Sequence, residues 1–231
     1  MREQLLWAAV FVSMLLIAAP AFAECGDAPA PGVDWSRCQK PKMVFGGANL
    51  KGANLMLADV GRTDFQGADL SGADLTKADL SRARLERANL AGANLQGADL
   101  GRANAREADF TKANLSKAEL GRADLRKANL GGADLTKAEL GRTDLREANM
   151  AGASLARAYL ARADVRGAHL AGADLTGADL SYANIEDTDL SQAQGLTQEQ
   201  IDRACGSQQT VLPAGLEAAA GWPCPQEDEE E

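Results

Sequence analysis

Few residues of this 231-residue chain have the types and spacing that catalysis requires. The single histidine, His169, stands just before Leu170 in a position that is usually Asp or Asn. The carboxylates recur at a constant interval, whereas a catalytic acid–base pair normally occurs once. The glycines follow the same interval and form no phosphate-binding loop. The sequence therefore predicts a protein that is not an enzyme and that needs no cofactor or metal.

Arginines form the most regular set of charged residues. One row follows a step of 20 residues: Arg62, Arg82, Arg102, Arg122, Arg142 and Arg162. A second row with the same step is Arg106, Arg126, Arg146 and Arg166. A row of guanidinium groups can contact the carboxylates or phosphates of an anionic polymer. The alternative is a solvated row that nearby acids neutralise and that only keeps the protein soluble.

A five-residue repeat must position these side chains. From Phe45 to Leu190 every fifth residue is apolar, and the residue two places before each one from Leu50 onward is Ala or Thr. A period of five fits neither an α-helix nor a flat strand. Such short units bury their apolar residues by stacking on copies of themselves, so the sequence predicts a solenoid.

The residue types also predict four units per coil. The second residue after each apolar one shows this pattern when it is compared at steps of 20 residues. In one series it is always arginine, from Arg62 to Arg162, and in another it is mostly glycine, from Gly52 to Gly172. Four units per coil would place each row along one side of a square tube. Copying of an ancestral 20-residue unit would leave the same pattern, so this alternative stays open.

The register A-(D/N)-L-x-x resembles the pentapeptide-repeat proteins, and it reads here as ANLKGANL, ADLSGADLTKADL and ANLAGANLQGADL. The resemblance implies an all-β fold, a right-handed quadrilateral β-helix of about seven coils, over residues 45–194. Some members of that family resemble a DNA rod and bind a type II topoisomerase, which protects the enzyme from quinolones. Those members are cytoplasmic and carry extended acidic surfaces, and the continuous arginine rows of this chain depart from that pattern.

The inward positions should fill the tube. Leucine fills most of the space and alanine is small because four corners converge on a narrow axis. Ala105 stands at a leucine position and is followed by Phe110. We interpret this pair as volume compensation within one layer of a close-packed core.

The first residues read as a secretory signal. Arg2 precedes an apolar run, and Ala21-Phe22-Ala23 forms a small-x-small cleavage site. We therefore expect residues 1–23 to be removed near Ala23. The mature protein would be periplasmic or secreted and would have no membrane span, because the apolar run is too short for a confident one.

Four cysteines flank the repeats: Cys25, Cys38, Cys205 and Cys224. Four cysteines allow three pairings, and only Cys25–Cys38 with Cys205–Cys224 avoids bridging the length of the tube. The spacings fit no common zinc pattern. We therefore predict two small disulfide-stapled caps that cover the open ends, at residues 24–44 and 195–224.

The C-terminal flank contains two further signals. Thr197 with Gln200 forms a capping-box pattern, which predicts a short helix at about Gln198–Ala204. Residues 225–231 form an acidic tail that we expect to be disordered, and this tail supplies much of the net charge of −9.

These observations favour a non-enzymatic, exported structural or interaction scaffold. Its partner would be an unknown protein or an anionic polysaccharide on the arginine row, and we expect no nucleic acid as a ligand. The neutral glycine row would allow a side-by-side dimer. The alternative function is a DNA-mimic rod that binds a type II topoisomerase, which the signal sequence and the arginine rows disfavour.

Overall fold

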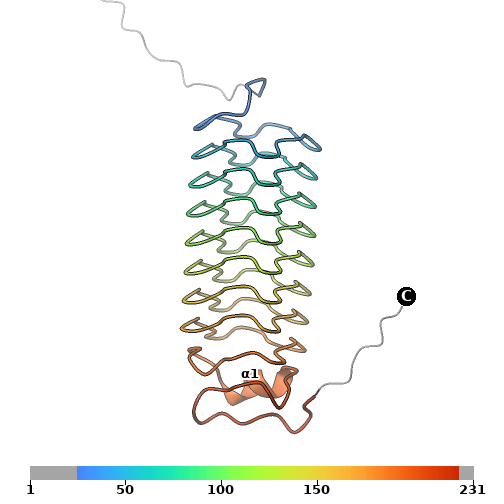
Figure 1. The fold of residues 1–231 in the computed structure, drawn as a ribbon, viewed down its shortest axis with the longest axis vertical. Helices are drawn as coiled ribbons and strands as arrows, with labels where there is room; N and C mark the ends of the chain where they lie inside the picture. Colours follow the sequence, from blue (N-terminus) through green and yellow to red (C-terminus); the bar gives the residue numbers. More distant parts are fainter. Residues whose placement is uncertain (1–24, 224–231) are drawn as a thin grey trace, which may run out of the picture.

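The computed structural model describes residues 25–223, and a five-residue unit with a tight turn repeats along residues 31–194 of this part (Figure 1). In each unit the backbone C=O of the central residue accepts a hydrogen bond from the N–H three residues later. Ala53 N, for example, donates to Leu50 O at 3.0 Å. The third residue of the turn, such as Gly52, has a positive φ of 64°. This combination is a type II turn, which requires positive φ at that position.

Four such units make one coil. Parallel bridges join residues that are 20 apart, such as Asn49 with Asp69 and Asp69 with Asn89. Each bridge is an isolated residue pair, so no extended strand is assigned within residues 25–223, and α1 (Gln198–Arg203) is the helix of this region. Figure 1 shows the coils stacked into an elongated rod with α1 at one end. The predicted solenoid with four units per coil is confirmed.

The core is a column of inward side chains with almost no exposed surface. Leu50, Leu75 and Leu100 are each 0% exposed, and so are most of their equivalents. Burying one leucine completely contributes about 1.5–3 kcal/mol. The alanine positions are equally buried, which confirms that two of every five residues point inward.

Threonine replaces alanine at three buried positions, and each hydroxyl has a defined partner. The side chains of Thr63, Thr143 and Thr188 donate to the backbone C=O of Lys40, Leu120 and Val165 at 2.8–3.0 Å. Each acceptor lies 23 residues earlier, in the preceding coil. The buried hydroxyls are therefore satisfied, as buried polar groups generally are.

The pair Ala105 and Phe110 provides a test of packing, because both side chains are buried, at 1% and 0% exposure. We expect Ala105→Leu to lower the free energy of unfolding by about 1–3 kcal/mol through overpacking. The double variant Ala105→Leu with Phe110→Leu should recover most of this loss. Urea unfolding of both single variants and the double variant measures the coupling, and additive losses would contradict volume compensation.

The N-terminal boundary differs from the predicted one. The sequence predicts a separate disulfide-stapled cap at residues 24–44, but the bridges already begin at Asp34, Gln39 and Val44. Trp35 occupies a central inward position with 0% exposure, and Cys38 occupies an inward alanine position. The first coil therefore begins about ten residues earlier than the recognisable repeat, and residues 25–30 alone precede it.

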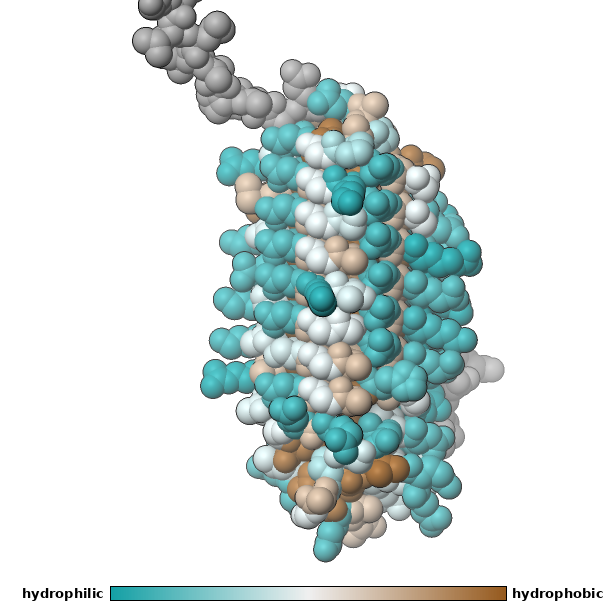
Figure 2. Space-filling model, turned by 60° about the vertical axis from the view of Figure 1, so that its left-hand side comes forward, coloured by the Kyte–Doolittle hydropathy of each residue, from teal (hydrophilic) through white to brown (hydrophobic). Residues whose placement is uncertain are grey.

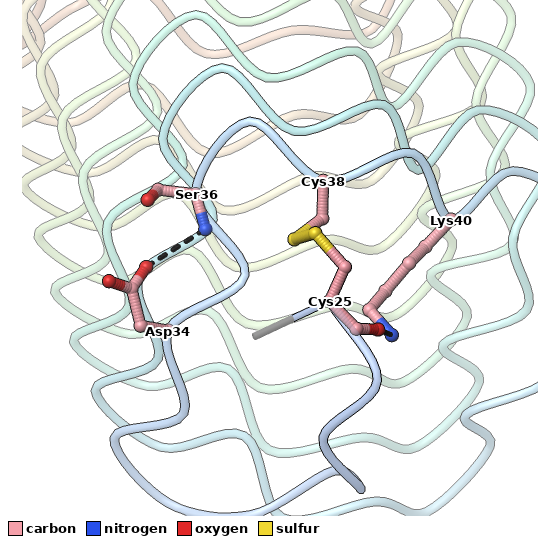
Figure 3. The surroundings of a disulfide bond; sticks show 5 residues. All are labelled: Cys25, Asp34, Ser36, Cys38 and Lys40. Atoms are coloured by element: carbon pink, nitrogen blue, oxygen red, sulfur yellow. Dashed lines mark hydrogen bonds between the residues drawn. A yellow bond between two sulfur atoms is a disulfide. The ribbon is translucent and has the colours of Figure 1, made fainter. Parts of the chain in front are cut away.

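Lysine can occupy an inward position in this first coil because the end of the tube is open. The Lys40 ammonium lies 4.2 Å from the centroid of the Trp35 ring and donates to the backbone C=O of Cys25 at 2.5 Å. The predicted Cys25–Cys38 disulfide is present and holds that carbonyl over the end of the coil (Figure 3). The Lys40 ammonium thus lies over the rings of Trp35 and Phe45 at this end of the tube.

The two ends of the rod differ in their backbone hydrogen bonds. Among the described residues, the N–H and C=O groups of Asp34, Gln39, Val44 and Asn49 bond to no other group, so the N-terminal coil has an open edge. At the other end Gln194, Cys205 and Val211 continue the bridge rows and close three sides.

Helix α1 covers the fourth side of the C-terminal end. The Thr197 side chain accepts from Gln200 N, and the Gln200 side chain accepts from Thr197 N, so the predicted capping box is confirmed. The Gln200 amide also donates to the C=O groups of Leu175 and Ala178, both at 2.9 Å. Ile201 is fully buried against the core.

Residues after the helix fold back across this end. Leu212, Leu216 and Trp222 pack against the core cluster, and the Trp222 indole N–H donates to Ala204 O at 2.7 Å. Cys205 is not a free thiol, whereas its predicted partner Cys224 lies outside the described residues. The predicted signal sequence with its cleavage site and the predicted acidic tail also lie outside them.

Candidate functional site

The arginine row lies at a corner of the tube and not on a flat side. Arg62, Arg82, Arg102, Arg122, Arg142 and Arg162 all occupy the third position of a turn, with φ between 56° and 59°. Lys42 precedes the row and Tyr182 follows it in the same position, with φ of 61° and 58°. The side chains of this corner row are exposed and project away from the rod.

This corner conformation explains the glycine row. Glycine adopts a positive φ without cost, whereas other residues lose about 1–2 kcal/mol in the left-handed region. Gly72 and Gly92 occupy the same turn position as Arg82 and Arg102, with φ of 64°. An arginine at this turn position in each of six successive coils therefore costs backbone free energy. Glycine at the same turn position in other rows avoids this cost.

The nearest acidic row does not pair with these arginines. Asp59, Asp79, Asp99, Glu119 and Glu139 lie in the same coils, three residues before each arginine. The aspartates bind their own turns instead, as Asp99 does by accepting from Gly101 N at 2.7 Å. Within residues 25–223, the first five arginines of the row form no ion pair shorter than 4.0 Å. These are Arg62, Arg82, Arg102, Arg122 and Arg142.

Three of the four arginines in the second row, Arg126, Arg146 and Arg166, are paired with aspartates within the molecule. The Arg126 guanidinium donates to both oxygens of Asp124 and lies 3.2 Å from Asp144 of the next coil. Arg146 repeats this arrangement with Asp144, at 2.7 Å, and Asp164, at 3.5 Å. Hydrogen bonding to Asp124 raises the pKa of Arg126, and that of Arg146 rises in the same way beside Asp144. Burial raises the pKa of Asp124, but the hydrogen bonds from Arg126 outweigh it and lower the pKa overall.

Turn position explains why Arg126 and Arg122 behave differently. Arg126 occupies the second position of its turn, from which its side chain folds back over Asp124 on the same side of the coil. Arg122 occupies the third position, where positive φ directs the side chain outward. Sequence spacing alone does not distinguish these two geometries.

One side of the rod therefore carries excess positive charge. We call it the basic face, and it consists of residues 102–106, 122–126, 142–146 and 162–166. Each segment begins and ends with arginine, and Asp124, Asp144 and Asp164 are the acidic residues within them. On the other side of the corner, Asp99, Glu119 and Glu139 line a shallow groove with Gly101 and Gly121.

The neutral side contains an amide ladder. Asn149 donates to Asn129 at 3.0 Å, and His169 continues this row in the next coil. Figure 2 shows a stripe of small, near-neutral residues that runs along the rod between hydrophilic rows. Within the described residues no group of His, Cys, Asp and Glu has a metal-binding arrangement, and no helix there is long and apolar enough to cross a membrane.

Family comparison agrees with this architecture. The model of pentapeptide repeats matches eight copies, in the ranges 44–82, 53–92, 88–130, 123–160 and 153–192. The chain belongs to the pentapeptide-repeat family. Pentapeptide-repeat proteins fold as right-handed quadrilateral β-helices, and this membership assigns the same handedness to the rod. The family consists generally of non-enzymatic structural or interaction proteins, and no enzyme family matches.

Several solved pentapeptide-repeat structures are similar to this one. HetL, involved in heterocyst differentiation regulation in the cyanobacterium Nostoc, is 32% identical, with 83% of this chain and 94% of HetL covered and a TM-score of 0.46. A trypsin-treated form of QnrB1, a plasmid-mediated fluoroquinolone resistance protein, is 21% identical over 78% of this chain and 84% of its own, with a TM-score of 0.59. The QnrB1 likeness shows the shared fold alone. No curated protein matches the sequence.

Proposed function

We propose that the protein is an exported, non-enzymatic scaffold that binds an anionic polymer along its basic face. The observation that carries this proposal is the corner row of arginines, whose first five members form no ion pair within residues 25–223. Export is supported by the signal-like residues 1–23 and by the Cys25–Cys38 disulfide, which is typical of oxidising compartments.

The spacing of the row suits a polymer better than a single small anion. Successive coils repeat at about 4.8 Å, so the guanidinium groups form a regular series along the rod. Arginine binds carboxylates and phosphates through two parallel hydrogen bonds. A chain that carries one negative group per repeating unit can therefore contact several arginines at once.

The test replaces three arginines with glutamine. We expect Arg102→Gln, Arg122→Gln and Arg142→Gln together to weaken binding of polygalacturonate at least tenfold, because three charged contacts are lost. Binding by the unmodified protein should weaken as salt is added. The melting temperature should hardly change, because exposed charges contribute about 0–1 kcal/mol.

A matched control exists at the neighbouring corner. Lys77, Lys117 and Lys137 occupy the same turn position, with φ of 54–60°, on the far side of the acidic row. Their replacement by glutamine changes the net charge equally and should leave polygalacturonate binding almost unchanged. Equal losses in the two triple variants would show that only the overall charge matters and would contradict a specific basic face.

A DNA-mimic rod that binds a type II topoisomerase is the alternative function. Such a rod should present continuous negative charge, whereas the acidic row from Asp59 to Glu139 lies between cationic corners on both sides. This arrangement makes the alternative weaker. Protection of a type II topoisomerase from a quinolone by the purified protein would support it against the polymer-binding proposal.

A further inference from the structure

A pocket of about 390 Å³ lies at the C-terminal end of the arginine corner row. Its lining includes Tyr182, Trp222, Asp202, Arg203 and Ser181. We propose that this pocket holds one sugar ring of an acidic polysaccharide whose charged groups lie along the basic face. The inference rests on the proposed function and names the class of polymer.

The pocket continues the corner row directly. Tyr182 takes the place that the next arginine would occupy, and the Arg162 guanidinium lies 5.7 Å from the centroid of its ring. Tyr182 is 67% exposed, so its ring is available to a ligand. A polymer that follows the arginines therefore meets an aromatic surface where the row ends.

The second aromatic residue is held in place by the C-terminal segment. The Trp222 indole N–H donates to Ala204 O at 2.7 Å. Its ring lies so close to Gly206 that a Cβ atom there would be 2.4 Å from the indole. The indole is thus fixed before any ligand binds, which lowers the entropic cost of binding.

Two polar residues of the pocket, Asp202 and Arg203, lie on helix α1. Asp202 accepts from the Gln198 side chain at 2.8 Å through one carboxylate oxygen, and Arg203 pairs with Glu199 at 2.6 Å through one nitrogen. The other carboxylate oxygen and the other guanidinium N–H groups remain able to bind a ligand. An acceptor beside a donor suits neighbouring sugar hydroxyls, which both donate and accept.

This combination favours a sugar over a bare polyphosphate. Apolar walls with a few fixed polar groups are typical of small-ligand pockets, and Tyr and Trp offer an apolar body with a polar tip. The Asp202 carboxylate would repel a phosphate group but accept a hydroxyl. Polyphosphate can therefore use the basic face, whereas the pocket requires a ring with hydroxyl groups.

The test separates the pocket from the basic face. Tyr182→Asn removes the ring and suits the positive φ of 58°, because asparagine tolerates the left-handed region. We expect this variant to bind polygalacturonate about tenfold more weakly and polyphosphate as the parent does. Tyr182→Phe should retain both affinities. Tyr159→Asn removes another exposed tyrosine, outside the pocket, and should have no effect.

The outcomes distinguish the two proposals. Suppose that Tyr182→Asn binds polygalacturonate as well as the parent does, while the arginine triple variant binds it more weakly. This result would contradict the sugar-binding pocket and would still support the basic face. A loss in Tyr182→Asn for both polymers would mean that the residue supports the fold or the charge, which also overturns the pocket. If the parent binds neither polymer, both proposals are wrong.

Discussion

Gly195→Ala is expected to lower the free energy of unfolding by about 2–5 kcal/mol. Gly195 stands where the repeat would place the next central leucine, and the chain there passes close to Thr176 of the coil before. An added Cβ would lie 2.1 Å from the Thr176 hydroxyl and 2.8 Å from its backbone nitrogen. A positive φ of 73° adds about 1–2 kcal/mol to an overpacking cost of about 1–3 kcal/mol.

Gly172→Ala is the matched control for this prediction. Gly172 has a similar φ of 70°, but a Cβ atom there would meet open space. This variant should lose only the backbone contribution of about 1–2 kcal/mol. Urea unfolding monitored by circular dichroism compares the two, and equal losses would show that the close approach to Thr176 does not constrain the chain.

Leu120→Ala should destabilise the protein by about 2–5 kcal/mol, as large-to-small changes in a packed core do. Leu120 is 0% exposed and lies in the middle of the rod, with further coils on both sides. In a solenoid each coil is stabilised mainly by its neighbours, so a central cavity weakens the contacts in both directions.

Leu57→Ala provides the comparison for the central leucine. Leu57 lies at a turn corner and is 43% exposed. Its replacement should change the free energy of unfolding by less than about 0.5 kcal/mol, as is usual for surface substitutions. Similar losses for Leu57→Ala and Leu120→Ala in urea unfolding would contradict the assignment of the inward column.

Most of the fold can be predicted from the sequence because the same short pattern of residues repeats along it. The five-residue period identifies the inward residues, and the step of 20 identifies the coil. The N-terminal boundary escaped detection because Cys38, Lys40 and Met43 replace the usual alanine and leucine. A lysine is tolerated inside only in the end coil, where its ammonium group reaches the Cys25 carbonyl. That contact depends on the disulfide and cannot be read from the repeat.

The site was less predictable than the fold. Sequence spacing identified both arginine rows, but it could not show that Arg126 folds onto Asp124 while Arg122 projects outward. One signal was present, because many glycines share this turn position with the arginines, and glycine there indicates a positive φ. The pocket with Tyr182 and Trp222 depends on how a non-repetitive segment folds over the last coil, for which no period exists.

Because bridged residues are 20 residues apart along the repeats, the length of the rod is set by its number of 20-residue coils. Removing or adding one full coil in the middle would keep every remaining residue on its own side and would leave both ends unchanged. The number of arginines along the corner would change by one each time, while the chemistry of each contact would stay the same. Length, and with it the number of polymer units spanned, can therefore vary in evolution or by design independently of the ends.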